Sequence, residues 1–252
     1  MKINLKTFLF SGVLFCICIE GFYPRMCIGQ VELFSHLYGG YSHHRPTEMK
    51  LNLNGEYYEI SNVRFSSQSL RLPIYYGISA GISVSKKFPL CLSIEFIHDK
   101  AYVRESKAVQ ITKSTDPDRP AGHTMHFSDI MNKFSMSHGF NFILIKISYP
   151  LKSGSIWNNK YAIYMGLAAG GMLPHVESKN DNQTREKYEF HKLSGMVDLY
   201  SEYTFYKNMF LVTGIKYTYA GINDAGIVKG NLSTHIHSWH FVIGLGFRLS
   251  LS

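Results

Sequence analysis

The sequence predicts an all-β protein, an eight-stranded antiparallel transmembrane β-barrel with long extracellular loops and short periplasmic turns. Two observations predict this fold. After residue 30, apolar and polar residues alternate within eight short stretches, as in strands that face lipid on one side. The gaps between the stretches are long and short in strict turn, which fits loops at one end of a barrel and tight turns at the other.

The eight predicted strands are residues 31–42, 74–85, 90–103, 139–149, 161–173, 192–205, 210–222 and 235–249. Tyr and Trp residues gather where these strands meet the gaps, as in the aromatic girdles of membrane barrels. No run of about 18 apolar residues follows residue 30, which argues against a helical inner-membrane protein. Strands cross lipid only as a closed barrel, because every backbone polar group needs a partner within the protein. We therefore expect an outer-membrane protein of a Gram-negative bacterium.

The first 30 residues have the features of a signal peptide. Lys2 and Lys6 provide a positive start, and residues 7–19 (TFLFSGVLFCICI) form an apolar run. About 13 apolar residues suit the apolar region of a signal peptide and are short for a spanning helix. A buried element and a lipoprotein signal are the alternatives. We expect a signal peptide over residues 1–30 and an outer-membrane barrel over residues 31–252.

The chain is basic, with a formal charge of +8 and a pI of about 9.2. Its Lys and Arg residues are spread over predicted loops and strand ends rather than clustered on one element, which argues against nucleic-acid binding. The same spread fits an anionic membrane surface. Cys91 is the one cysteine after residue 30, so we expect neither an intrachain disulfide nor a cysteine metal site in the barrel.

Period-two alternation fixes which side chains face the barrel interior. In the third predicted strand, Leu90, Leu92 and Ile94 share the lipid face, and Glu95 lies on the interior face. The same parity places further titratable side chains inside, namely Glu32, His36, Lys146, Asp198, Glu202, Lys216, His240 and Arg248. Side chains fill the interior of an eight-stranded barrel, and unpaired buried charges are costly. We therefore predict an ion-paired structural plug.

A set of short motifs spans nearly all of the predicted barrel. They are LYGGY (37–41), PIYYGI (73–78), SIEFIHDKAYV (93–103), FSD (127–129), HGFN (138–141), GLAAGG (166–171), PHVE (174–177) and SEY (201–203). The most specific pieces are the Glu-Phe-x-His-Asp-Lys run of residues 95–100 and the Pro-His-Val-Glu run of residues 174–177. Together these motifs resemble the bacterial lipid A oxidase family of outer-membrane barrels.

The resemblance implies an enzyme that acts on lipid A, the membrane anchor of lipopolysaccharide. Members of this family oxidise the proximal glucosamine of lipid A to 2-aminogluconate. They use molecular oxygen as co-substrate, release hydrogen peroxide and need a divalent metal ion. The substrate has a free anomeric position, so its 1-phosphate is already absent. We expect lipopolysaccharide and outer-membrane lipid as partners, no nucleic acid, and a monomer.

Candidate site residues lie at strand ends that would share one rim of the barrel. The chain has no flavin or nicotinamide motif, so a bound redox metal is the economical way to engage oxygen. His and carboxylate side chains suit such an ion. The predicted metal ligands are His175, Glu177 and Asp99; the candidate catalytic residues are Asp99, His98 and Glu95; the candidate lipid A-binding residues are Lys100, Arg104 and His44. By parity, His98 points toward lipid and Asp99 inward.

Two other functions stay open. A non-enzymatic structural or adhesive barrel has the same fold, and fold alone does not decide activity. A lipid A acyl hydrolase or transferase would need a Ser–His–acid set, for which Ser137, His138 and Asp129 are available. The sequence favours an enzyme and an oxidase. Convergence of His175 and Glu177 with Asp99 or His98 would support the oxidase.

Overall fold

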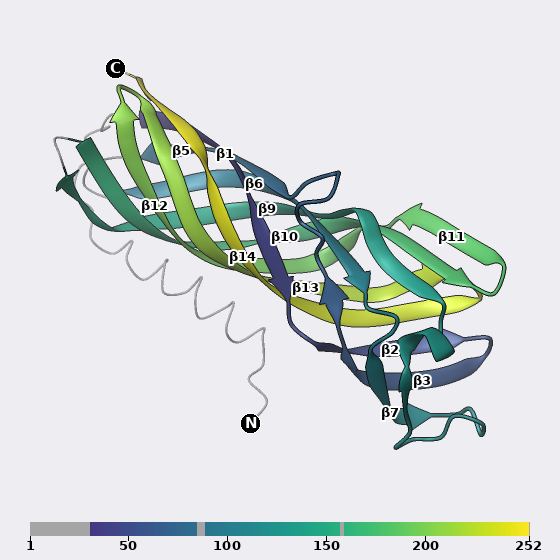
Figure 1. The fold of residues 1–252 in the computed structure, drawn as a ribbon. Coiled ribbons are helices and arrows are strands. Elements are labelled where there is room, and N and C mark those ends of the chain that lie inside the picture. Colours follow the sequence, from purple (N-terminus) through teal and green to yellow (C-terminus); the bar gives the residue numbers. More distant parts are fainter. Residues whose placement is uncertain (1–30, 85–88, 157–158, 252) are drawn as a thin grey trace, which may run out of the picture.

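Eight antiparallel strands form a ring in the computed structural model, which describes residues 31–84, 89–156 and 159–251 (Figure 1). The predicted signal peptide lies outside the described residues, as does most of the predicted turn at 86–89. In ring order the strands are β1 (Val31–His44), β5 (Tyr76–Val84), β6 (Leu90–Val103), β9 (Lys133–Ile156), β10 (Asn159–Asn180), β12 (His191–Tyr206), β13 (Met209–Ile227) and β14 (Gly230–Leu251). The pairing of β1 with β14 along all of β1 completes the ring.

All eight predicted strands are present, but β9, β10, β13 and β14 are each at least six residues longer than predicted. β9 was expected over residues 139–149 and β10 over 161–173, and each continues well beyond these limits. β13 and β14 also continue, and a turn at Val228 and Lys229 joins them. The predicted loop between residues 222 and 235 is therefore mostly strand. A strand of about ten residues is enough to cross a membrane, so the long strands project beyond it.

The other predicted long loops also contain regular structure. The first holds β2 (Thr47–Leu53), β3 (Glu56–Val63) and β4 (Phe65–Ser66); the second holds β7 (Ala108–Ser114), β8 (Thr124–His126) and the short helix η2 (Phe127–Asp129); the third holds β11 (Gln183–Tyr188). β2, β3, β7 and β8 pair in succession and continue the sheet outward from β14. We call these added strands, together with the projecting ends of the long strands, the extension. Figure 1 shows its small sheet at the end of the molecule remote from the C-terminus.

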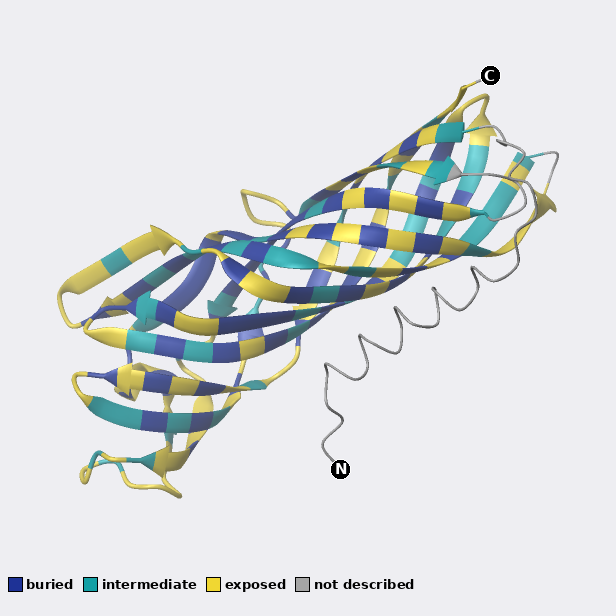
Figure 2. Ribbon diagram, turned by 180° about the vertical axis from the view of Figure 1, so that it is seen from behind, coloured by how far each residue is buried: buried dark blue, intermediate teal, exposed yellow. Residues whose placement is uncertain are grey.

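The outer face of the ring carries a wide apolar belt. On β14 the side chains of Trp239, Phe241, Ile243, Leu245 and Phe247 are all exposed, whereas His240 between them is buried. Figure 2 shows the same alternation of buried and exposed residues along the other strands. Exposed apolar side chains that alternate with buried polar ones are the signature of strands in contact with lipid. The predicted parity is confirmed.

The polarity of the two faces reverses in the extension. Beyond Trp239, the inward residues of β14 include the apolar Leu232 and Ile236 as well as Thr234, and the outward ones include Ser233 and His235. β9 reverses in the same way. There the apolar residues point inward, as in a protein surrounded by water. The reversal places the membrane boundary close to Trp239.

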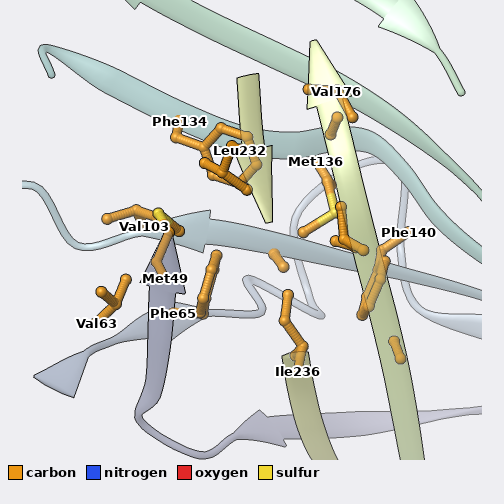
Figure 3. Close-up of a cluster of buried hydrophobic side chains, with 14 of the residues drawn as sticks. Met49, Val63, Phe65, Val103, Phe134, Met136, Phe140, Val176, Leu232 and Ile236 are labelled. Carbon is orange, nitrogen blue, oxygen red and sulfur yellow. The ribbon is translucent and has the colours of Figure 1, made fainter. Parts of the chain in front are cut away.

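A cluster of buried apolar side chains fills the interior of the extension. Phe134, Met136 and Phe140 of β9 belong to this cluster together with Val176 of β10 and Leu232 of β14 (Figure 3). Met49 of β2, Phe65 of β4 and Val103 at the end of β6 complete this cluster. At the level of the belt the ring is filled by polar and charged side chains together with a smaller cluster that includes Phe34, Tyr200 and Phe210, and beyond the belt it is filled mainly by apolar side chains. Within the described residues, no helix has the length and apolar character needed to span a membrane.

Candidate functional site

The centre of the ring holds the predicted ion-paired plug. Glu95 lies 2.7 Å from Lys146 Nζ and 2.7 Å from Lys216 Nζ. Asp198 contacts the same two ammonium groups at 3.1 and 2.8 Å. The Tyr38 hydroxyl also donates to Glu95, and all five side chains are buried. Two carboxylates thus neutralise two ammonium groups, and Glu95 lies in a buried ion-paired group rather than at the rim of the barrel.

A second polar group fills the ring toward its turn end. Arg248 lies 3.1 Å from Glu32, and it also forms an ion pair with Glu202. His36 contacts Glu202 at 3.1 Å. Tyr164 accepts a hydrogen bond from Arg248 at 3.3 Å. Glu32, His36, Glu202 and Arg248 point inward as parity predicts, and the predicted interior ion pairs are confirmed.

Asp99 and His44 belong to a third interior layer, between the plug and the apolar cluster. Asp99 Oδ1 accepts a hydrogen bond from Ser42 Oγ at 2.6 Å. Its Oδ2 lies 3.8 Å from His240 Nδ1 and 4.0 Å from His44 Nε2. The His44 ring contacts Ser238 Oγ and the carbonyl oxygen of Lys100, both at 2.8 Å. This layer is fully buried, so it does not form the open rim site that the sequence suggested for Asp99 and His44.

The predicted site is divided between the two faces of the wall. Asp99, Glu95 and His44 lie inside, whereas His98, His175 and Glu177 lie outside. His98 stacks on Tyr76 with ring centroids 5.0 Å apart, and its Nδ1 lies 2.7 Å from Asn141 Oδ1. The opposite directions of His98 and Asp99 are as parity predicted. Convergence of all these residues at one rim is not observed.

The two basic residues expected to bind lipid A phosphate also differ from expectation. Lys100 is buried, and its Nζ donates a hydrogen bond to the carbonyl oxygen of Arg71 at 2.6 Å. It therefore fixes a loop and does not present a charge to head groups. Arg104 is exposed beyond the end of β6, where its backbone nitrogen donates to the carbonyl oxygen of Arg64 at 2.9 Å.

The residues present do not fit the divalent metal ion that the resemblance implies. His175 and Glu177 lie outside the wall and Asp99 lies inside it, so the three do not surround one point. The carboxylate of Glu177 is already occupied by Lys133 and by Ser135 and Ser137. In the part of the chain that the structure describes, no group of three or more His, Cys, Asp or Glu side chains is placed to hold a metal.

The most irregular point of the wall is a bulge in β9. Against β6, Asp99 pairs with Phe140 and Ala101 pairs with Met136, so residues 137–139 of β9 lie opposite Lys100 alone. The pairing of β9 with β10 shifts at the same place. Gly139 has a φ of 147°, and a Cβ there would lie 2.3 Å from the side chain of Asn141. Bulges re-aim side chains and are over-represented beside active sites.

The bulge gathers polar side chains on the outside of the wall. Ser137 Oγ lies 2.9 Å from His138 Nδ1 and donates to Glu177 at 2.8 Å. Ser135 donates to Glu177 at 3.0 Å, and the rings of His138 and His175 meet edge to face at 5.0 Å. We call Lys133, Ser135, Ser137, His138, His175 and Glu177 the outward cluster. It lies just beyond the apolar belt, which on β9 begins at Ile143.

Hydrogen bonding holds Glu177 in its charged form. Partial burial alone would raise the pKa of this carboxyl group, but hydrogen bonds from Lys133, Ser137 and Ser135 outweigh burial and lower the pKa. A charged carboxylate, a serine hydroxyl and an imidazole therefore meet at one point. Such groups accept and pass protons, so the cluster is equipped for general acid–base chemistry.

Sequence reasoning found part of this cluster through its hydrolase alternative. That alternative paired Ser137 and His138 with Asp129, but Asp129 instead accepts a hydrogen bond from the backbone of His126 at η2, at 3.0 Å. The acid beside Ser137 is Glu177, from a different strand. The PHVE motif had marked Glu177 as functional, although as a metal ligand. Its pairing with Ser137 depends on the bulge, which carries no local sequence pattern.

Comparison with known proteins gives similarity of fold alone. No protein-family model and no curated protein matches the chain. The outer membrane protein OprG from Pseudomonas aeruginosa is 10% identical, with a TM-score of 0.44 over 89% of this chain and 97% of that chain. Neisserial surface protein A is 9% identical, with a TM-score of 0.36 over 86% and 96%. The outer membrane protease OmpT from Escherichia coli is 8% identical, with a TM-score of 0.34 over 90% and 99%. Values this low carry no information on activity or partners.

The location of the protein follows from its own surface. A ring of eight antiparallel strands with an outward apolar belt and a polar interior is the architecture of outer-membrane barrels. Proteins that are surrounded by water rarely expose so many Ile, Leu and Phe side chains in one continuous band. The chain is an outer-membrane β-barrel protein.

Proposed function

We propose that this protein is an outer-membrane enzyme that modifies lipid A at the outward cluster. The bulge in β9 carries the proposal. It brings together, on the outer side of the wall just beyond the lipid-facing belt, the exposed imidazole of His138, the partly buried carboxylate of Glu177 and the buried hydroxyl of Ser137. The sugar head group of lipid A would meet the barrel wall at this level. A substrate embedded in the membrane reaches such a site laterally, without entering the filled interior.

The reaction implied by the sequence resemblance is oxidation of the proximal glucosamine to 2-aminogluconate, with oxygen reduced to hydrogen peroxide. For this reaction, His138, which is exposed, is the group placed to take the proton of a sugar hydroxyl. Lys133 keeps Glu177 charged, and the charged carboxylate holds the Ser137 hydroxyl beside His138. The residues that would supply redox chemistry are not assigned, because the expected ligand set is divided by the wall.

Hydrolysis of a lipid A acyl chain is the second candidate, and the contact between Ser137 and His138 favours it. A serine activated by an imidazole attacks an ester carbonyl in many hydrolases. Here the order is His138, Ser137, Glu177, whereas in the Ser–His–acid triad the imidazole lies between the other two groups. Hydrolysis would therefore require His138 alone to act as base, or Glu177 to replace it.

Mass spectrometry of lipid A separates these reactions. The chain would be expressed in a Gram-negative host whose lipid A is available with and without the 1-phosphate. Oxidation adds one oxygen atom to the proximal sugar, only in air and only without the 1-phosphate. Hydrolysis removes an acyl chain and needs neither condition. Unchanged lipid A in every arm would overturn both reactions and leave the structural or adhesive role.

Variants of the outward cluster test the site itself. Ser137→Ala and Glu177→Gln should abolish the modification while the barrel remains folded, because both residues lie on the outside of the wall. Ser106→Ala, at an exposed serine before β7, is the matched control and should keep full activity. Loss of activity in the control, or full activity in both cluster variants, would remove the outward cluster from the reaction.

A further inference from the structure

We propose that the loop between β4 and β5 enters the adjacent membrane leaflet and contacts lipid acyl chains beside the barrel. At its tip, Leu70 and Leu72 are 84% and 88% exposed, and Ile74 is 51% exposed. Figure 2 shows the wall of the barrel with an exposed loop standing out from it near mid-length. If the loop faced water, these large apolar side chains would remain in contact with it. In lipid, their apolar surface is removed from water, which is favourable.

The base of the loop is held firmly against the barrel. The backbone nitrogen of Tyr75 donates to the carbonyl oxygen of Ser69 at 2.9 Å, and Ser69 Oγ accepts from the backbone nitrogen of Ser42 at 3.0 Å. The buried Lys100 donates to the carbonyl oxygen of Arg71 at 2.6 Å. Ser69 and Tyr75 are buried. Because these contacts hold both ends of the loop in place, its apolar tip has a defined outward direction.

The surroundings of the tip point to lipid as its occupant. Ile74, Tyr76 and Ile78 follow one another at every second position, and Ile78 belongs to the lipid-facing belt. The apolar tip is therefore continuous with a surface already covered by acyl chains. Arg71 lies between the two leucines and is exposed. A long basic side chain among apolar neighbours can reach an anionic phosphate while its neighbours remain in hydrocarbon.

Fluorescence quenching by brominated lipid tests this contact. The background is the chain with Trp157→Phe, in which Trp239 serves as the reference because it is exposed on the belt. With Trp239→Phe added, Leu72→Trp reports on the loop tip, and Lys187→Trp on the exposed β11 of the extension is the matched control. Each variant is reconstituted in phosphatidylcholine vesicles with or without bromine on the acyl chains, and its folding is checked by electrophoretic mobility without heating.

Leu72→Trp should lose emission in brominated vesicles to an extent similar to Trp239, while Lys187→Trp should be unaffected. Leu72→Trp emission equal in the two kinds of vesicle would overturn the proposal. Emission that shifts with the protein-to-lipid ratio but not with bromine would overturn it too, and would identify a second copy of the chain as the occupant. These results do not depend on any reaction of lipid A, so the test is separate from that of the proposed function.

Discussion

At the scale of single residues, the buried charges of the plug make the sharpest prediction. Glu95→Ala removes one carboxylate from between two buried ammonium groups. An uncompensated buried charge typically costs about 3–5 kcal/mol, so the free energy of unfolding should fall by about that amount. Urea unfolding in lipid vesicles, followed by tryptophan fluorescence, measures it.

Glu32→Ala is the control for this change. Glu32 pairs with Arg248 at the turn end, where both side chains are partly exposed. Exposed ion pairs contribute about 0–1 kcal/mol, so this variant should be close to the wild type. Equal losses in the free energy of unfolding for the two variants would contradict the prediction that the buried charges of the plug contribute more than the exposed pair.

The lowered pKa of Glu177 predicts a pH-dependent contribution to stability. A carboxyl group whose pKa is lowered by folding stabilises the fold above its ordinary pKa of 4.5, and that contribution disappears as pH falls through the folded value. At neutral pH, Glu177→Gln should therefore reduce the free energy of unfolding by about 0.5–1 kcal/mol. Below pH 4.5 the difference between the two chains should shrink.

Unfolding titrations across this pH range, in the wild type and in Lys133→Met, test the cause. Lys133 is the charged partner of Glu177, so adding Glu177→Gln to Lys133→Met should cause less loss than it causes in the wild type. A full additional loss would mean that Lys133 does not hold the carboxylate.

What the sequence revealed at single positions depended on whether the strand was regular. Parity placed Glu95, Lys146 and Asp198 inside and separated His98 from Asp99, because regular alternation extends through the belt. Parity does not extend across the β9 bulge, where residues 137–139 lie opposite Lys100 and interrupt the alternation. The partner of Ser137 therefore could not be read from spacing along the chain.

At the scale of elements, the strands were found from the lipid-facing pattern, and their ends were lost where that pattern reversed. In the belt, the outward residues of β9, such as Ile143 and Ile145, are apolar. In the extension, its apolar residues Phe134 and Met136 face inward, and the bulge at residues 137–139 interrupts the alternation between the two parts. Because the lipid-facing apolar pattern stops at this reversal, the sequence beyond it resembles a polar loop. The added strands β2, β3 and β7 were missed because polar gaps between barrel strands were taken to be irregular.

The reversal predicts opposite tolerance for charge on the two parts of one surface. Ile147→Lys places a charge in the middle of the belt on β9 and should cost about 2–4 kcal/mol in lipid vesicles. Lys179→Ile replaces a charge by an apolar residue on the exposed outer side of β10 in the extension. That change should alter stability by no more than about 0.5 kcal/mol. Similar effects of the two substitutions on urea unfolding would place the membrane boundary elsewhere.

At the scale of the whole molecule, the orientation of the ring decides at which face of the outer membrane the outward cluster lies. Barrels of this type carry short turns on the periplasmic side and larger segments outside. The two-residue turn between β12 and β13 lies at one end, and the extension lies at the other. The extension should therefore be extracellular, with the outward cluster at the level of lipopolysaccharide head groups.

Cysteine labelling on intact cells tests this orientation. Asp118→Cys lies in the exposed segment between β7 and β8, and Lys207→Cys lies in the turn between β12 and β13. Cys91 is buried, so the wild-type chain supplies the background. A membrane-impermeant maleimide should label Asp118→Cys on intact cells and Lys207→Cys only after the outer membrane is permeabilised. The reverse result would turn the molecule over, and the outward cluster would then face the inner leaflet, where lipid A is absent because lipopolysaccharide occupies the outer one.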